Sequence, residues 1–310
     1  MKAAAYRRTG PPEVIEVIEK DKPIAKDNEV LVRVYASSVN PVDTMLRRSK
    51  AFSFFARTGD NIVGSDLSGI IESAGRNVTT LKKGDEIYGF RRAGATAEYS
   101  TIQVKKVAIK PKNMTFEQAA AVPLAGLTAL QALHNIGKIQ SGQNVLINGA
   151  TGGVGSYAVQ IAKSYDTNVT GVTSESNLKL AESLGADNVI NYNKENFTNS
   201  KDKFDIILDA AAKSNFSKCQ NILNNNGIFI STRFGARLLL NILLTSIVGN
   251  KKAKTVMVNS NTKDLDTLTN LIENDKIISV IEKTFPIDKT SDAHAHIEKG
   301  HTKGKIVINI

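Results

Sequence analysis

The stretch 144–163, NVLINGATGGVGSYAVQIAK, decides the fold of this 310-residue chain. It opens with the apolar run Val145 to Ile147, which predicts a buried strand, and it closes with residues that fit one side of a helix. Between them stand the glycines Gly149, Gly152, Gly153 and Gly155. Glycines let a ligand approach the backbone closely, and a helix N-terminus offers free N–H groups and the positive end of the helix dipole. The stretch therefore predicts a site for the pyrophosphate of a dinucleotide.

The glycine spacing alone is weak support, because G-x-x-G-G-x-G departs from the strict fingerprint and also fits a bare tight turn. The downstream sequence favours the cofactor site, since strand and helix patterns alternate as far as Ser231. This alternation predicts an α/β fold with a doubly wound parallel Rossmann sheet, whose strands end along one ligand-binding edge. The expected strands cover 144–147, 168–172, 188–190, 204–208 and 227–231, and the expected helices cover 154–163, 177–184 and 214–223.

The region before residue 123 is rich in strand patterns. Turns of Gly, Pro and Lys separate these short strands, which predicts a barrel-like antiparallel domain. A capping box at 115–118 and Pro123 mark the change to helix. We therefore expect a first domain over 1–122, a nucleotide-binding domain over 123–260, and a return to the first domain over 261–310.

The composition is that of an ordinary globular protein, with 41% hydrophobic and 23% charged residues. The single cysteine, Cys219, cannot form an internal disulfide and is expected to be buried in a helix. The N-terminus lacks the apolar core of a signal peptide, so a cytoplasmic location is expected. The apolar stretch 238–248 is too short to span a bilayer. We expect it to pack over the substrate cleft or at a subunit contact, with a membrane surface as the alternative.

The net charge is +10, from 40 basic and 30 acidic residues. Such a surplus can favour nucleic acid or an anionic membrane. The lysines are dispersed and form no cluster with aromatic residues, so we expect a solvated surface and no nucleic-acid partner.

The whole order of patterns resembles the medium-chain dehydrogenase/reductase superfamily. Within it, the chain is most similar to the zinc-free, zeta-crystallin-like quinone oxidoreductases, and closest to chloroplast-envelope-type quinone and alkenal/enone oxidoreductases. The resemblance implies a GroES-like β-barrel catalytic domain beside the Rossmann domain. The motifs that carry it are SVNPVD at 38–43, GLTAL at 126–130, GATGGVG at 149–155, LGAD at 184–187 with Asn191 and Tyr192, and GKIV at 304–307.

The resemblance also predicts that no metal is bound. Zinc alcohol dehydrogenases of this superfamily place a cysteine near 40–43 and a histidine near Ser65, and this chain has neither. The three histidines His294, His296 and His301 are expected to be solvent-exposed rather than metal-binding. Without a Lewis acid, alcohol oxidation is disfavoured, whereas hydride delivery to an electron-poor quinone or enone is not.

The end of the second expected strand decides between NADH and NADPH. An NAD enzyme places an acidic residue there to bind the ribose hydroxyls, and the aligned residue here is Thr173. The expected contacts of the 2′-phosphate are the donors and the cation near this strand end, Ser174, Asn177, Lys179 and Tyr192, the last through the resemblance. Glu175 argues against NADPH, because it follows Gly155 by 20 residues. That is roughly where the acidic residue that binds the ribose of NAD is expected. We place Glu175 beyond the strand end, pointing outward, and predict NADPH.

The resemblance assigns further roles. Asn40 would lie beside the nicotinamide and the acceptor, Asp43 would orient its loop, and Thr128 would lie near the nicotinamide. From spacing alone, the first two also fit a helix cap, and Thr128 also fits a residue packed on the sheet. The remaining cofactor residues are Gly149, Thr151, Gly152, Gly153, Val154 and Gly155 at the pyrophosphate, and Phe234 and Gly235 at the far wall of the nicotinamide.

The predicted function is metal-free hydride transfer from NADPH to a quinone or an α,β-unsaturated carbonyl. Its proton would come from water, Tyr6 or Tyr88, and the sequence does not choose among them. The alternatives are an alcohol dehydrogenase and an NADPH-responsive protein that binds RNA or membrane. The expected partner is a small molecule, with no membrane span and with a homodimer as a further possibility.

Overall fold

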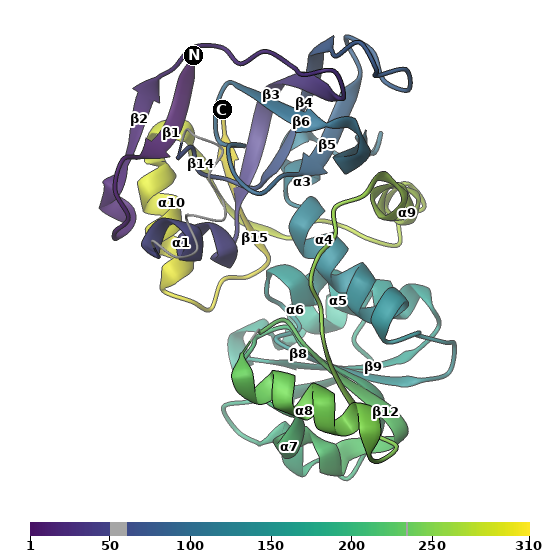
Figure 1. Ribbon diagram of the computed structural model, residues 1–310. Coiled ribbons are helices and arrows are strands. Elements are labelled where there is room, and N and C mark those ends of the chain that lie inside the picture. Colours follow the sequence, from purple (N-terminus) through teal and green to yellow (C-terminus); the bar gives the residue numbers. More distant parts are fainter. Residues whose placement is uncertain (50–60, 234) are drawn as a thin grey trace. The chain divides into compact units, whose positions relative to one another are not determined.

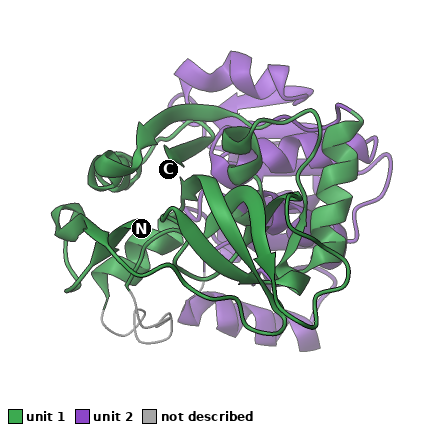
Figure 2. Cartoon of the chain, turned by 90° about the horizontal axis from the view of Figure 1, so that it is seen from above, with its two compact units in different colours: residues 1–124, 260–274, 279–310 green, residues 125–259, 275–278 purple. Residues whose placement is uncertain are grey.

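The computed structural model of the chain describes residues 1–49, 61–233 and 235–310. It forms two compact units, each assembled from more than one segment (Figure 1 and Figure 2). Unit 1 comprises 1–124, 260–274 and 279–310, and unit 2 comprises 125–259 and 275–278. No described helix has both the length and the apolarity needed to cross a bilayer.

Unit 2 holds a six-stranded, entirely parallel sheet in the order β10-β9-β8-β11-β12-β13. This is the doubly wound Rossmann order, which confirms the predicted fold class. The strands are β8 (Asn144–Asn148), β9 (Asn168–Thr173), β10 (Asn188–Asn191), β11 (Phe204–Asp209), β12 (Leu223–Ser231) and β13 (Lys252–Thr255). Helices cover both faces, so the apolar run of β8 is fully buried: Val145, Leu146 and Ile147 are each 0% exposed.

The helices of unit 2 divide between the two faces of this sheet. Figure 1 shows α5 (Gly153–Ser164) and α6 (Leu178–Ser183) on one face, with α7 (Phe216–Cys219) and α8 (Ala236–Ile247) on the other. Before the sheet, α4 (Pro123–Leu130) begins at its proline and continues into a π-helical segment, Gln131–Ile136. The expected helix 214–223 is wrong at its end, because a short 3-10 segment follows α7 and Leu223 already pairs with Phe204 in the sheet.

Unit 1 is built around a largely antiparallel sheet, as expected for the first domain. Its main sheet has the order β14-β15-β3-β4-β5-β7, with β6 also paired to β3, and a β1-β2 hairpin lies beside it. All pairs are antiparallel except β14 with β15. The strands are β1 (Lys2–Tyr6), β2 (Ile15–Glu19), β3 (Glu29–Val39), β4 (Asp66–Ala74), β5 (Glu86–Phe90), β6 (Tyr99–Gln103), β7 (Val107–Ile109), β14 (Ile281–Pro286) and β15 (Lys305–Asn309).

The described part of unit 1 also contains the helices α1 (Pro41–Arg48), α3 (Phe116–Ala120), α9 (Thr262–Glu273) and α10 (Thr290–Glu298). The barrel core is built from inward-facing residues of β3, β4 and β5, among them Val32, Leu67 and Ile87. Strand β15 enters the sheet between β14 and β3, with Ile306 opposite Val39. The last strand of the chain therefore lies directly beside the residues that lead into α1.

Candidate active site

The glycine turn between β8 and α5 follows the carboxyl end of β8, one of the inner strands of the unit 2 sheet. Gly149 has a φ of +85°, and its N–H donates to the Val172 carbonyl at 2.9 Å. A Cβ on Gly155 would lie 1.9 Å from the Gly149 carbonyl oxygen. Glycine is thus required at 149 and 155 by the turn itself, because a side chain there meets backbone or forces a disfavoured conformation.

Gly152 differs from these two glycines. Its backbone is extended, with φ of −80°, and a Cβ there would meet only the Gly149 carbonyl oxygen, at 3.5 Å. Gly152 is also the N-cap of α5, whose first N–H groups have no partner within the helix. The protein leaves room for a side chain at this position and presents backbone donors beside it. That combination fits a bound pyrophosphate.

The strand order reverses between β8 and β11, and two polar side chains meet there. Asn148 Nδ2 donates to Asp209 Oδ1 at 2.7 Å, and the fully buried Asp209 also accepts the Ser214 N–H at 2.9 Å. Ligands of doubly wound folds bind at this reversal. We did not single out Asn148 or Asp209 from the sequence, although a polar residue directly after each apolar strand was the available signal.

Thr173 ends β9 and faces the glycine turn. Its hydroxyl lies 2.6 Å from that of Thr151, and the residue is 3% exposed. Glu175 follows in a 3-10 turn, is exposed, and pairs with Lys194 at 2.6 Å. This agrees with the expectation that Glu175 points outward, beyond the strand end.

The residues predicted to contact the 2′-phosphate surround this strand end. Ser174 directly follows β9, the Asn177 N–H donates to the Ser174 carbonyl at 3.0 Å, and Lys179 is exposed in α6. The Tyr192 N–H donates to the Thr173 carbonyl at 3.1 Å. Beside them, the buried Asn191 Nδ2 has no hydrogen-bond partner among the described residues. Neutral donors, a cation and an unused amide fit an anionic group here.

The residues assigned to the nicotinamide are less clearly grouped. Thr128 is 7% exposed within α4. Gly235 is the N-cap of α8 and has extended backbone, and nothing described lies within 4 Å of a Cβ built on it. Phe234 lies outside the described residues. The roles of these three residues remain predictions.

In unit 1 the stretch Asn40–Asp43 belongs to a buried polar cluster, which we define as Ser38, Asn40, Asp43, Ser65, Asp66 and Lys305. Asp66 Oδ2 accepts from Ser38 Oγ at 2.7 Å, from Asn40 Nδ2 at 2.9 Å and from Lys305 Nζ at 3.4 Å. Its Oδ1 accepts the Leu124 N–H at 2.9 Å. Lys305 also donates to Asn40 Oδ1. The side-chain amide of Asn40 is therefore held at both ends.

Asp43 fixes the start of α1. Its Oδ2 accepts the Asn40 N–H at 2.8 Å, and its Oδ1 accepts the Ser65 hydroxyl. Burial raises the pKa of Asp43 to about 7, although both hydrogen bonds oppose the shift. Burial also lowers the pKa of Lys305, against the attraction of Asp66 and Asp43. The helix-cap interpretation of Asn40–Asp43 is confirmed by this geometry, and the catalytic roles remain predictions.

Four members of the cluster were not among the predicted site residues: Ser38, Ser65, Asp66 and Lys305. Of the two charged ones, Lys305 lies in the GKIV motif at 304–307, and Asp66 directly follows Ser65, near which zinc alcohol dehydrogenases place a histidine. The available signal was a charged residue inside an apolar strand pattern, since buried charges are retained only when they are paired.

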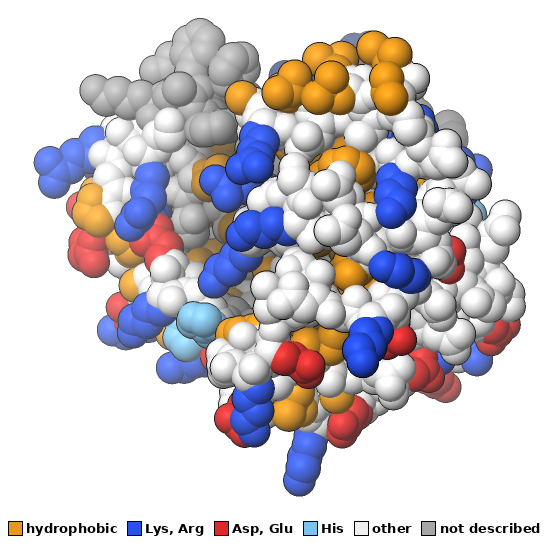
Figure 3. Space-filling view, turned by 90° about the horizontal axis from the view of Figure 1, so that it is seen from below, with side chains coloured by type: hydrophobic (Ala, Val, Ile, Leu, Met, Phe, Trp, Pro, Cys, Tyr) orange, Lys and Arg blue, Asp and Glu red, His pale blue; other side chains and the backbone are white. Residues whose placement is uncertain are grey.

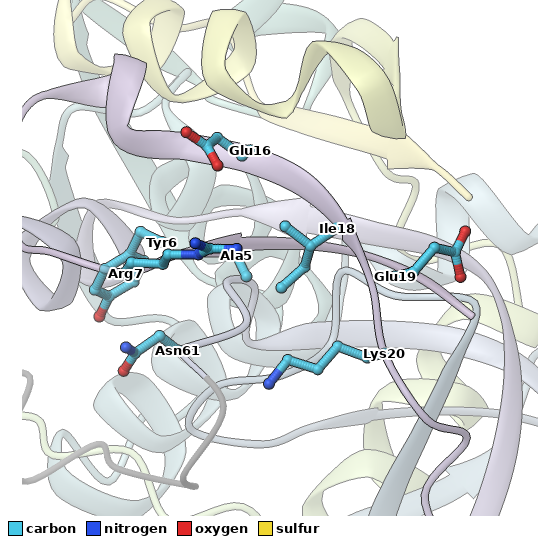
Figure 4. A pocket seen from close by; sticks show the side chains of 8 residues that line it. All are labelled: Ala5, Tyr6, Arg7, Glu16, Ile18, Glu19, Lys20 and Asn61. Carbon is cyan, nitrogen blue, oxygen red and sulfur yellow. The ribbon is translucent and has the colours of Figure 1, made fainter.

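The two candidate tyrosine donors lie in unit 1. Tyr88 is 0% exposed and donates to the Leu265 carbonyl at 2.7 Å, and burial raises its pKa, so it is a poor proton donor. Tyr6 is 9% exposed and lines a cavity of about 290 Å³ between the β1-β2 hairpin and Asn61 (Figure 4). Arg7, Lys20, Glu16 and Glu19 also line this cavity, so it mixes both signs of charge.

The expectation of exposed histidines is wrong for His294. It is 1% exposed on the inner side of α10, and burial lowers its pKa to about 3, with Arg47 acting in the same direction. His296 instead lies 3.0 Å from Glu282. The charged residues of α10 suggested an exposed helix, but one face of α10 packs against the core of unit 1. Cys219, by contrast, is buried as expected, and burial raises its pKa to about 11.

Comparison with known proteins identifies the family. Residues 26–112 match the alcohol dehydrogenase GroES-like domain family, and residues 184–308 match the zinc-binding dehydrogenase family. A 2-methylene-furan-3-one reductase of Solanum lycopersicum is 34% identical, over 100% of this chain and 79% of the relative. An NADPH-dependent alkenal/one oxidoreductase of Arabidopsis thaliana is 32% identical, over 99% and 79%. The quinone oxidoreductase from Coxiella burnetii superposes with a TM-score of 0.91 at 29% identity, over 100% and 99% of the two chains.

The chain belongs to the quinone oxidoreductase branch of the medium-chain dehydrogenase/reductase superfamily. One of the matching families is described as zinc-binding, so the donor set of this member has to be tested against zinc. Zinc sites use three or four Cys, His or carboxylate ligands. The described residues contain no group of three such side chains placed to hold a metal. In the buried polar cluster, the ammonium of Lys305 forms an ion pair with Asp66, where a metal ion would need a further ligand. The residues that the structure describes therefore do not fit a zinc site.

Proposed function

We propose that this member of the quinone oxidoreductase branch transfers a hydride from NADPH to a quinone or an α,β-unsaturated carbonyl, without a metal. The observation that carries the proposal is the end of β9. A neutral, buried threonine stands where an NAD enzyme has a carboxylate, and the carboxylate two residues later, on Glu175, is paired with Lys194. A 2′-phosphate at this position would therefore meet hydrogen-bond donors and cations rather than a carboxylate that repels it.

The relatives support the choice of acceptor. They are named for enone, alkenal and quinone substrates, which share a carbonyl conjugated to a carbon–carbon double bond. Such acceptors are electron-poor without a Lewis acid. This agrees with the poor fit of the buried polar cluster to zinc.

NADPH supplies the hydride when it is bound, and the protein supplies binding and orientation. The glycine turn and the start of α5 would hold the pyrophosphate, and the strand end at Thr173 would select the phosphorylated ribose. The buried polar cluster of unit 1 fixes the Asn40 loop, so Asn40 and Asp43 act as positioning residues. The proton that completes the reduction comes from water in this proposal, because Tyr88 is engaged by α9 and burial raises the pKa of Tyr6.

The test is a panel of quinones and enones with NADPH and with NADH, followed by the nicotinamide absorbance. We expect turnover of at least one class of conjugated acceptor with NADPH, a clear preference over NADH, and no loss of activity with a chelator. Oxidation of simple alcohols without enone or quinone reduction would overturn the proposal. RNA retention in a filter assay without any turnover would favour the non-enzymatic alternative.

We also infer a cytoplasmic protein that can form a homodimer. The single cysteine supports the location, and the prevalence of closed dimers among oligomers supports the assembly. Sedimentation velocity over a range of protein concentrations tests the assembly, and cell fractionation tests the location.

A further inference from the structure

Helix α8 presents an apolar strip to solvent. The strip consists of five side chains of α8 and the residue directly after it, with exposed fractions from 40% to 82%: Leu239, Leu240, Leu243, Leu244, Ile247 and Val248. Their spacing places them along one side of the helix. Figure 3 shows hydrophobic side chains gathered along the upper edge of that view, where α8 runs. Contiguous exposed apolar patches of this kind mark interaction surfaces.

The opposite side of α8 is firmly held by unit 2. Leu238 and Ile242 pack against the core cluster that contains Phe229 and Ala253. The buried Thr245 hydroxyl accepts the Ala253 N–H at 3.0 Å and donates to the Asn241 carbonyl at 2.8 Å. The strip is therefore displayed by an anchored helix.

All charged residues in the segment that carries α8 are basic. Residues 210–259 contain no Asp or Glu and include the cations Lys213, Lys218, Arg233, Arg237, Lys251, Lys252 and Lys254. The sequence led us to expect dispersed charge, and this segment departs from that expectation. Among the described residues, none of these seven cations forms an ion pair. Lys251 and Lys252 donate to backbone carbonyls, which leaves their charge uncompensated.

We propose that α8 docks this protein on an anionic lipid surface, with the apolar strip in the interface and the flanking cations against the headgroups. An anchored helix with an apolar face and Lys or Arg beside it is the pattern of interfacial membrane binding. A second copy is a poorer occupant, because two α8 surfaces would bring fourteen cations together. The strip is purely aliphatic, whereas protein interfaces concentrate their binding energy in Trp, Tyr and Arg. This docking needs no membrane span and is independent of the proposed reductase activity.

The test is flotation of the full chain with vesicles of phosphatidylcholine and phosphatidylglycerol in equal parts, and with phosphatidylcholine alone. We expect binding to the anionic vesicles that weakens as salt is raised. The double variant Leu243→Gln/Ile247→Gln should lower the bound fraction at least about tenfold, because two exposed aliphatic side chains no longer insert. The matched control is Ile24→Gln, which changes an 88% exposed aliphatic residue in unit 1 and should bind like the wild type.

Two further measurements keep the test decisive. Circular dichroism reports whether the double variant is folded, and the single variants Leu243→Gln and Ile247→Gln replace it if it is not. Sedimentation velocity compares the self-association of the wild type and the variant. No flotation with anionic vesicles at low salt, or equal flotation of the variants, would overturn the proposal. Self-association that disappears with the α8 variants would do the same, because the strip would then be covered by a second copy.

Discussion

The strand edge of unit 2 and the buried polar cluster of unit 1 use polar groups in opposite ways. Around the end of β9 and the start of α5 the groups are neutral donors, helix N–H groups and the exposed ammonium of Lys179, and the Nδ2 donor of the buried Asn191 has no partner among the described residues. In the cluster, the buried carboxylate of Asp66 pairs with the ammonium of Lys305, and the buried carboxylate of Asp43 accepts from the Asn40 N–H and the Ser65 hydroxyl. Unused donors beside open backbone indicate a place for a ligand, whereas mutually satisfied buried charges indicate a scaffold. The two regions should therefore fail differently when they are mutated.

The largest expected effect is on the scaffold. Lys305→Met leaves Asp66 and Asn40 buried without their cation, and should lower the free energy of unfolding by about 3–5 kcal/mol. Urea unfolding measures this. The matched control, Lys303→Met, lies two residues away on the surface and should change stability by less than about 0.5 kcal/mol. Equal stability of the two variants would mean that the cluster is not a scaffold.

The next effect is on the pH dependence of stability. Asp43 has a pKa of about 7 in the folded chain, above the ordinary value of 3.8. The contribution of Asp43 to the free energy of unfolding is therefore fully present below about pH 4 and is lost as the pH rises through about 7. Relative to Asp43→Asn, the wild type should lose about 2–4 kcal/mol of unfolding free energy between about pH 4 and pH 8. Parallel pH profiles for the two proteins would show that Asp43 does not hold its proton.

The glycine turn sharpens the comparison within a single loop. Gly152→Val places a side chain where the ligand would lie, so the Kd for NADPH should rise at least about a hundredfold while stability falls by about 1 kcal/mol or less. Gly155→Ala instead pushes a Cβ into the Gly149 carbonyl and should cost about 1–3 kcal/mol of stability. Fluorescence titration and urea unfolding separate the two losses. Unchanged NADPH affinity in the Gly152→Val variant would contradict the pyrophosphate assignment.

The smallest expected effect concerns the choice of coenzyme. Thr173→Asp would place a carboxylate against the 2′-phosphate, where the Thr151 hydroxyl can still donate to it. We expect kcat/KM for NADPH to fall at least about tenfold, while that for NADH holds or rises. Glu175→Gln is the control, because Glu175 pairs with Lys194 and should not affect the preference. If the wild type uses NADH as well as NADPH and loses that ability in Glu175→Gln, Glu175 is the ribose ligand.

The sequence by itself determined the Rossmann sheet and the place of the glycine turn. Both are local: an apolar run, a group of glycines and a helical period follow one another within 20 residues, and each predicts its own element. The absence of a carboxylate at Thr173 was also readable, because the strand end is fixed by the same local pattern. The limits of the helix expected over 214–223 were not, because its last residue is drawn into a parallel strand pair by Phe204.

Only the tertiary structure decided how the charged residues are used. Asp66 and Lys305 are 239 residues apart in the sequence and meet because β15 enters the sheet beside β3. The burial of His294 and the exposure of the leucines of α8 were also decided by the tertiary structure. Helical periodicity does not say which face of a helix packs against a core. Periodicity records which residues lie on one side of an element, and long-range packing decides whether that side is buried, paired or left open. Here that packing enclosed the charges of the cluster and left the α8 strip in solvent.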